Sequence, residues 1–233
     1  MPASPHTEAI RTHLLSGVQP ARQLIEKIGI SQATLSRAMN QLGDEVVRLG
    51  AARSMQYALR DAVQGWADFN IYRIDAQGQI SLVGNLVAVR PEGFVLRQAD
   101  GMTVHSHGLP WWLVDMRPQG YLGRAYAARY GAELGLPTRL SDWNDHHALR
   151  ALLAHGDDVV GNLLLGDAAR QRFLSAASPQ PVTDEQKGET YVRLAREAAS
   201  GGAAGSSAGG EQPKFTVYAT TPSGPHHLLV KFS

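Results

Sequence analysis

The stretch that organises this chain is GGAAGSSAGGEQPKFTVYATTPSGPHHLLVKFS, residues 201–233. Glycine and other small residues fill its first ten positions, and two apolar runs follow on either side of the turn-type sequence TPSGP at 221–225. Apolar runs separated by such a turn are typical of paired antiparallel strands. The stretch therefore predicts a β-hairpin that the chain enters through a glycine-rich loop.

Two interpretations of the glycine-rich loop are open. Small side chains let backbone N–H groups approach an anion, and a lysine on a neighbouring strand adds a point charge, so the loop suits phosphate binding. The same composition is typical of a flexible linker that binds no ligand. The sequence GEQPK at 210–214 runs directly into a strand, which a linker does not require, and this favours phosphate binding.

Two motifs in this stretch resemble the HipA-like serine/threonine kinase family. SSAGGEQPK at 206–214 is similar to the phosphate loop of that family, and LLVK at 228–231 is similar to its ATP-contacting lysine strand. The resemblance implies autophosphorylation at Ser207, with ATP and Mg²⁺ as cofactors of the complete kinase. It implies an ATP site made of Ser206, Ser207, Ala208, Gly209, Gly210, Lys214 and Lys231.

The resemblance extends over roughly residues 69–233 and includes the segments 111–124 and 157–166. In a HipA-like kinase, the aspartate and asparagine side chains that act on the substrate hydroxyl and on Mg²⁺ lie beyond the lysine strand. The sequence stops two residues after Lys231, so no catalytic residue is assigned and we expect no kinase activity from this chain alone. It is then either a piece of a longer kinase or a protein that works without phosphoryl transfer, for example paired with a separately encoded kinase lobe.

Residues 21–42 resemble the helix-turn-helix of bacterial transcription regulators. Leu24, Ile25 and Ile28 give a first helix an inner face, and Gly29 permits the positive φ of a tight turn. Ser31 is placed to cap a second helix. With the apolar positions turned inward, the outer face of this second helix carries side chains of the kind that read bases and contact phosphates.

Two short strands are predicted at 46–50 and 55–59, where they resemble the wing of a winged helix. Arg48 and Arg53 would then contact the DNA backbone beside the recognition helix. The alternative is a helical hairpin that makes only protein contacts. The predicted DNA-binding residues are Ser31, Gln32, Ala33, Thr34, Ser36, Arg37, Arg48 and Arg53.

The net charge, the cysteine content and the lack of long apolar runs each exclude certain kinds of binding or location. A formal net charge of +1 gives no global attraction to nucleic acid, so DNA binding must come from a local patch. There are no cysteines, which excludes disulfides and thiolate metal sites and fits a reducing compartment. No long apolar run and no signal-peptide pattern is present, so we expect a cytoplasmic protein without a membrane partner.

The middle of the chain predicts an antiparallel meander with strands at 69–74, 80–89, 93–97 and 103–105, followed by a helix at 121–134. The tryptophan pair at 111–112 is expected to anchor a core. Histidine pairs occur without a third ligand at metal-binding spacing, so no metal site is predicted. The carboxylates Asp142, Asp145, Asp157 and Asp158 are expected to be structural.

The predicted fold class is α+β. Residues 1–61 form a winged helix-turn-helix, residues 69–177 a small β-rich subdomain, and residues 183–233 the start of a kinase-like lobe. One hypothesis is a DNA-binding regulator fused to part of a HipA-like toxin kinase, with duplex DNA and an antitoxin or a kinase lobe as partners and a homodimer left open. The other is a winged-helix regulator whose β domain binds an effector or a protein without catalysis.

Overall fold

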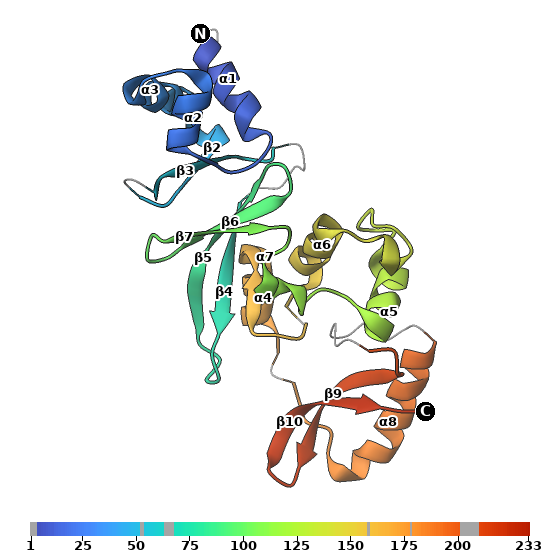
Figure 1. The fold of residues 1–233 in the computed structure, drawn as a ribbon. Helices are drawn as coiled ribbons and strands as arrows, with labels where there is room; N and C mark the ends of the chain where they lie inside the picture. Colours follow the sequence, from blue (N-terminus) through green and yellow to red (C-terminus); the bar gives the residue numbers. More distant parts are fainter. Residues whose placement is uncertain (1–3, 52–53, 63–67, 158, 178, 201–209) are drawn as a thin grey trace. The chain divides into compact units, whose positions relative to one another are not determined.

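A computed structural model describes residues 4–51, 54–62, 68–157, 159–177, 179–200 and 210–233. The chain forms two compact units (Figure 1). Unit 1 contains Met1–Arg73 and Ile80–Pro110, and unit 2 contains Ile74–Gln79 and Trp111–Ser233. The predicted α+β class is confirmed, since both units mix helices with antiparallel strands.

Unit 1 begins with three helices, α1 (Pro5–Leu14), α2 (Ala21–Ile28) and α3 (Gln32–Leu42), followed by the 3-10 helix η1 (Gly43–Glu45). Gly29 ends α2 in the left-handed conformation, with φ of 71°. Ser31 caps α3, because its hydroxyl accepts a hydrogen bond from the Thr34 backbone N–H at 3.1 Å. The predicted turn and cap are therefore confirmed.

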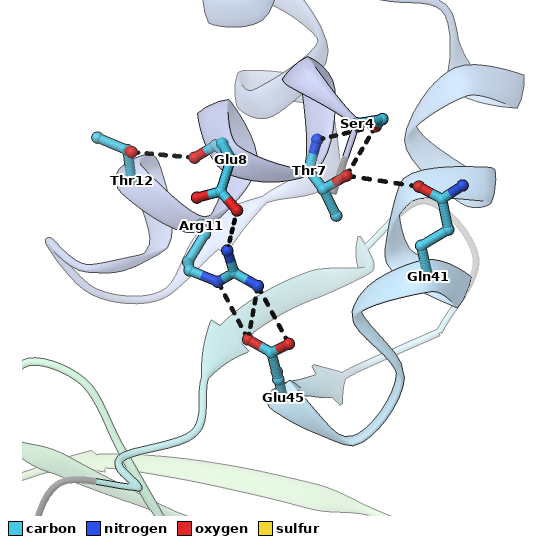
Figure 2. A network of polar contacts seen from close by, with 7 residues as sticks. All are labelled: Ser4, Thr7, Glu8, Arg11, Thr12, Gln41 and Glu45. Atoms are coloured by element: carbon cyan, nitrogen blue, oxygen red, sulfur yellow. Dashed lines mark hydrogen bonds and ion pairs between the residues drawn. The ribbon is translucent and has the colours of Figure 1, made fainter. Parts of the chain in front are cut away.

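The three helices pack around one apolar core, and polar contacts fix α1 against its neighbours. Figure 2 shows Arg11 of α1 forming a two-pronged pair with Glu45, with distances of 3.0 and 3.1 Å, and a further ion pair with Glu8. Thr7, which is almost fully buried, donates to the side chain of Gln41 on α3. The core side chains are Ile10, Leu14, Leu24, Leu35, Ala38, Met39, Leu42, Val46, Tyr57 and Leu59.

A three-stranded sheet follows the helices in the order β1-β3-β2, with β1 (Gln19–Pro20), β2 (Val46–Leu49) and β3 (Gln56–Leu59). β2 and β3 pair antiparallel with Arg48 opposite Tyr57. The two strands predicted for the wing are thus present.

The rest of unit 1 is an antiparallel meander of β4 (Phe69–Ile74), β5 (Ile80–Val89), β6 (Gly93–Gln98) and β7 (Thr103–His107), as predicted. Its inner face shares a second apolar core with β2 and β3, made of Val47, Leu49, Ala58, Val87, Val89 and Val95. The buried Asp61 pairs with Arg90 at 3.2 Å, and the Gly50 N–H donates to Thr103 Oγ1 at 2.9 Å. The helical part and the meander therefore form one body, while the predicted domain boundaries stay predictions.

Unit 2 contains α4 (Trp111–Val114), α5 (Gly120–Tyr130), the 3-10 helix η3 (Leu140–Asp142), α6 (Asp145–His155), β8 (Leu163–Leu165) and α7 (Gly166–Ser175). α5 ends at Tyr130, four residues before the predicted end, although Gly131 is still helical in conformation and the chain continues in turns as far as Gly135, whose φ is positive. The expectation that both tryptophans anchor a core is wrong for Trp111, whose side chain is 82% exposed.

The C-terminal part of unit 2 consists of α8 (Asp184–Ala199) and the hairpin β9 (Lys214–Thr221) and β10 (Gly224–Lys231). Thr183 and Gln186 form a capping box at the start of α8. Figure 1 shows α8 running beside the hairpin, and the Tyr191 ring of α8 lies 5.5 Å from the Phe215 ring of β9. The predicted hairpin is confirmed, with Lys231 opposite Lys214. In the part of the chain that the structure describes, no helix combines the length and apolar character needed to cross a membrane.

Candidate functional site

The outer face of α3 is the first candidate site. Gln32, Ala33, Ser36 and Arg37 are exposed, whereas Leu35, Ala38, Met39 and Leu42 point into the core. The hydroxyls of Ser31 and Thr34 lie 3.0 Å apart at the helix start, so both take part in capping. This leaves Gln32, Ser36 and Arg37 as the predicted side chains best placed for an external contact.

Arg48 lies on β2 beside the end of α3. Its side chain is exposed, and one guanidinium nitrogen donates to Asn40 Oδ1 at 2.8 Å. Arg48 and Asn40 line a shallow depression that Arg97 of β6 also borders. The structure thus brings Arg48 to the same surface as α3, while Arg53 lies outside the described residues.

Sequence reasoning missed Asn40 and Arg97. The helical spacing of Ala33, Arg37 and Asn40 contained the signal for Asn40, because residues three and four apart share a helix face. No sequence signal existed for Arg97, since β6 reaches the depression through the packing of the meander against β2 and β3.

The charge on this face is basic. α3 contains no acidic side chain, and its N-terminal end adds a partial positive charge. The neighbouring carboxylate of Glu45 is engaged by Arg11. Hydrogen bonds to Glu8 and then to Glu45 raise the pKa of Arg11 above its ordinary value, so the guanidinium group of Arg11 stays charged. The depression beside α3 contains one carboxylate, Asp44, against the guanidinium groups of Arg48 and Arg97, and Arg37 adds a further positive charge on α3.

The glycine-loop hairpin is the second candidate site. Ser206, Ser207, Ala208 and Gly209 lie outside the described residues, so the structure describes only Gly210, Lys214 and Lys231 of the predicted ATP site. The Gly210 carbonyl accepts hydrogen bonds from the Tyr121 N–H and from Lys214 Nζ, each at 3.0 Å. Lys214 is 1% exposed, whereas Lys231 on the opposite strand is exposed.

The contact between Gly210 and the start of α5 is close. A Cβ atom added to Gly120 would lie 2.6 Å from the Gly210 carbonyl oxygen, and Gly120 has a φ of +62°. Only glycine fits at position 120 without a shift of the backbone. The end of the glycine-rich stretch is therefore attached to a defined place, the first turn of α5.

The other titratable groups that the structure describes form ring contacts and ion pairs. His105 and His107 pack edge to face at 4.7 Å, and burial followed by the neighbouring His107 lowers the pKa of His105. Asp145 and Asp157 form ion pairs with Arg117 and Arg172. Among the described residues, no three His, Asp or Glu side chains gather in a way that could hold a metal ion.

Comparisons with known proteins relate the chain to a toxin family. Residues 65–174 match the model of the family described as YjjJ-like toxin, middle domain. The chain is 40% identical over 221 residues to Toxin YjjJ of Escherichia coli (strain K12), an alignment that covers 94% of this chain and 50% of that protein. The chain therefore spans about half the length of the curated relative it matches, and no solved structure matches it. Both similarities support a relationship to the YjjJ-like toxins.

Proposed function

We propose that this chain is the DNA-binding N-terminal part of a toxin of the HipA-like kinase type. The observation that carries the DNA-binding part is the exposed polar face of α3, whose only charged side chain is Arg37 and beside which Arg48 lies. The similarity to Toxin YjjJ supports the toxin assignment.

In this proposal, α3 enters the major groove of duplex DNA. Gln32 and Ser36 supply donors and acceptors for base edges, and Arg37 supplies a guanidinium fork for a guanine or a phosphate. Arg48 contacts the backbone, and its bond to Asn40 holds the guanidinium group at the end of the helix. The Arg11 pair and the Thr7 contact with Gln41 fix the position of α3 within unit 1.

The hairpin belongs, in this proposal, to the nucleotide-binding part of a kinase lobe. ATP with Mg²⁺ would supply the phosphoryl group. The exposed side chain of Lys231 would contact the ATP phosphates, and Lys214 would hold Gly210 in place through its hydrogen bond to the Gly210 carbonyl. No ligands for Mg²⁺ are assigned within the described ranges, so we derive no phosphoryl-transfer step. A cytoplasmic setting fits the absence of cysteine, and the similarity to Toxin YjjJ supports an antitoxin as partner.

The experiment is selection of duplexes from a random DNA library by the 233-residue protein, followed by titration at several salt concentrations. We expect an enriched motif and an affinity that falls steeply with salt, because lysine and arginine contacts release counterions. Recovery of no motif together with salt-independent affinity would favour the alternative, a helical hairpin and β domain that bind a protein or effector.

A further inference from the structure

A pocket of about 600 Å³ lies within unit 2. It is formed where the start of α5, the helix η3 and the start of α6 meet, and its volume lies within the range of small-molecule sites, about 300–1,000 Å³. The lining residues that matter here are Arg117, Pro118, Arg124, Arg139, Leu140, Trp143 and Glu211.

The charged part of this lining is mainly cationic. Three guanidinium groups face one lining carboxylate, that of Glu211, which pairs with Arg124 at 2.5 Å. Arg117 pairs at 3.5 Å with Asp145, which is not part of the lining. Arg139 is exposed and forms no ion pair with any residue of the described ranges. The pocket therefore holds cationic charge that its own carboxylate does not offset.

Helix geometry adds to this potential. Gln119 and Asn144, the N-cap residues of α5 and α6, both line the pocket. The side chain of Gln119 makes no capping hydrogen bond. Each helix start carries a partial positive charge, so both favour an anion at the same place as the arginines.

The other walls are apolar and rigid. Pro118, Leu140 and Trp143 contribute apolar surface. The indole N–H of Trp143 donates to the Pro137 carbonyl at 2.8 Å, and the Trp143 ring packs edge to face on Tyr126 at 6.2 Å. The aromatic wall is thus held in position without a ligand.

We propose that this pocket binds a small phosphate monoester that carries a compact ring. A guanidinium group can donate two parallel hydrogen bonds to phosphate oxygens. Three guanidinium groups around one pocket therefore suit a phosphate, which has three terminal oxygens, better than a carboxylate, which has two. The ring would lie against Trp143 and Leu140. This site is separate from the α3 face and does not depend on DNA binding.

Glu211 acts as an internal competitor in this proposal. Its carboxylate occupies Arg124 and repels an incoming dianion. Glu211→Gln removes that charge and should therefore tighten binding of the phosphate monoester. Loss of a residue that contacts the ligand would instead weaken binding.

The test is titration of the 233-residue protein with phenyl phosphate, followed by NMR at the indole N–H signal of Trp143, which Trp143→Phe assigns. We expect a saturable shift that phenol does not cause. Arg139→Ala should raise Kd about tenfold, as the loss of one charged hydrogen bond does. Glu211→Gln should lower Kd, and Arg193→Ala on α8, whose ion pair with Glu197 lies outside the pocket, should leave it unchanged.

Three results would overturn the proposal: no shift of the Trp143 signal, equal shifts with phenol, or an unchanged Kd in Arg139→Ala. A Kd that responds to Lys231→Ala and not to Arg139→Ala would place the phosphate at the hairpin instead. None of these results bears on DNA binding, which is measured separately.

Discussion

Lys214 Nζ donates a hydrogen bond to the Gly210 carbonyl at 3.0 Å, although the lysine side chain is 1% exposed. Its partner across the hairpin, Lys231, is exposed. Lys214 and Lys231 are opposite each other in one strand pair, yet the first is buried and the second is exposed to solvent. The buried lysine holds the end of the glycine-rich stretch, and the exposed lysine is the one available to a ligand.

Lys214→Ala should loosen the hairpin. The substitution removes a charged hydrogen bond and leaves a cavity, so the free energy of opening of β9 should fall by about 2–4 kcal/mol. Hydrogen exchange of the β9 amides measures this directly. Lys231→Ala is the matched control and should change the opening free energy by no more than about 0.5 kcal/mol. Equal effects of the two substitutions would contradict the distinction between these lysines.

Gly120→Ala should displace the end of the glycine-rich stretch from α5. The new Cβ would lie 2.6 Å from the Gly210 oxygen, and the left-handed conformation adds about 1–2 kcal/mol of strain. We expect faster exchange of the Tyr121 amide, which donates to Gly210. Gly188→Ala in α8 is the control: an added Cβ there meets no atom within 4 Å, so it should be neutral or stabilising. Retained Tyr121 protection in Gly120→Ala would refute the close-contact argument.

His147 should make the start of α6 sensitive to acid. Its Nδ1 accepts a hydrogen bond from the Asn144 N–H at 3.1 Å, which requires that nitrogen to be unprotonated. Burial, then the charges of Arg150 and His146, lower the pKa of His147 below 6.5. The unfolded state therefore binds more protons in acid, so this contribution is complete above about pH 6.5 and is lost as the pH falls below it.

The measurement for His147 is the opening free energy of the α6 amides at pH 5 and at pH 7.5. The expected loss is about 1 kcal/mol, the size of a capping interaction. His147→Gln keeps an acceptor in the capping box but does not titrate, so it should remove the pH dependence. If the unmodified protein and His147→Gln showed the same pH dependence, that dependence would belong to a titratable group other than His147.

The proposed kinase function predicts how a longer HipA-like kinase that contains this sequence would bind ATP. Ser207→Asp adds negative charge where nucleotide phosphates would lie, and Lys231→Ala removes a cation from the hairpin, so both should weaken ATP binding. Calorimetry on a version of the chain extended to a complete kinase checks this, with deletion of two glycines from 201–205 as a comparison. Unchanged ATP affinity in both point variants would favour the linker interpretation of the stretch.

Local sequence signals predicted much of the fold. Gly29, Ser31 and the turn at 221–225 act through the backbone of their own neighbourhood, so the helices and the hairpin could be derived from them. The α3 face followed from helical spacing alone. These features need no knowledge of what packs against them.

The remaining features depend on tertiary packing. The two lysines of the hairpin look alike in the sequence, and only the neighbours of β9 bury Lys214. The arginine pocket joins residues from 117 to 211, and Arg97 reaches the α3 surface through the sheet. Trp111 was expected to be buried because tryptophan usually is, yet α4 leaves it exposed.

The central claim is that α3 binds duplex DNA, and one comparison tests it most directly. Arg37→Ala and Arg73→Ala each remove one exposed arginine from unit 1, but Arg37 lies on α3 and Arg73 on β4, a strand that Figure 1 shows apart from α3. On a duplex selected by the protein, we predict that Arg37→Ala costs about 1–3 kcal/mol of binding free energy, while Arg73→Ala costs little. Equal losses from both substitutions, or full affinity in Arg37→Ala, would contradict the claim.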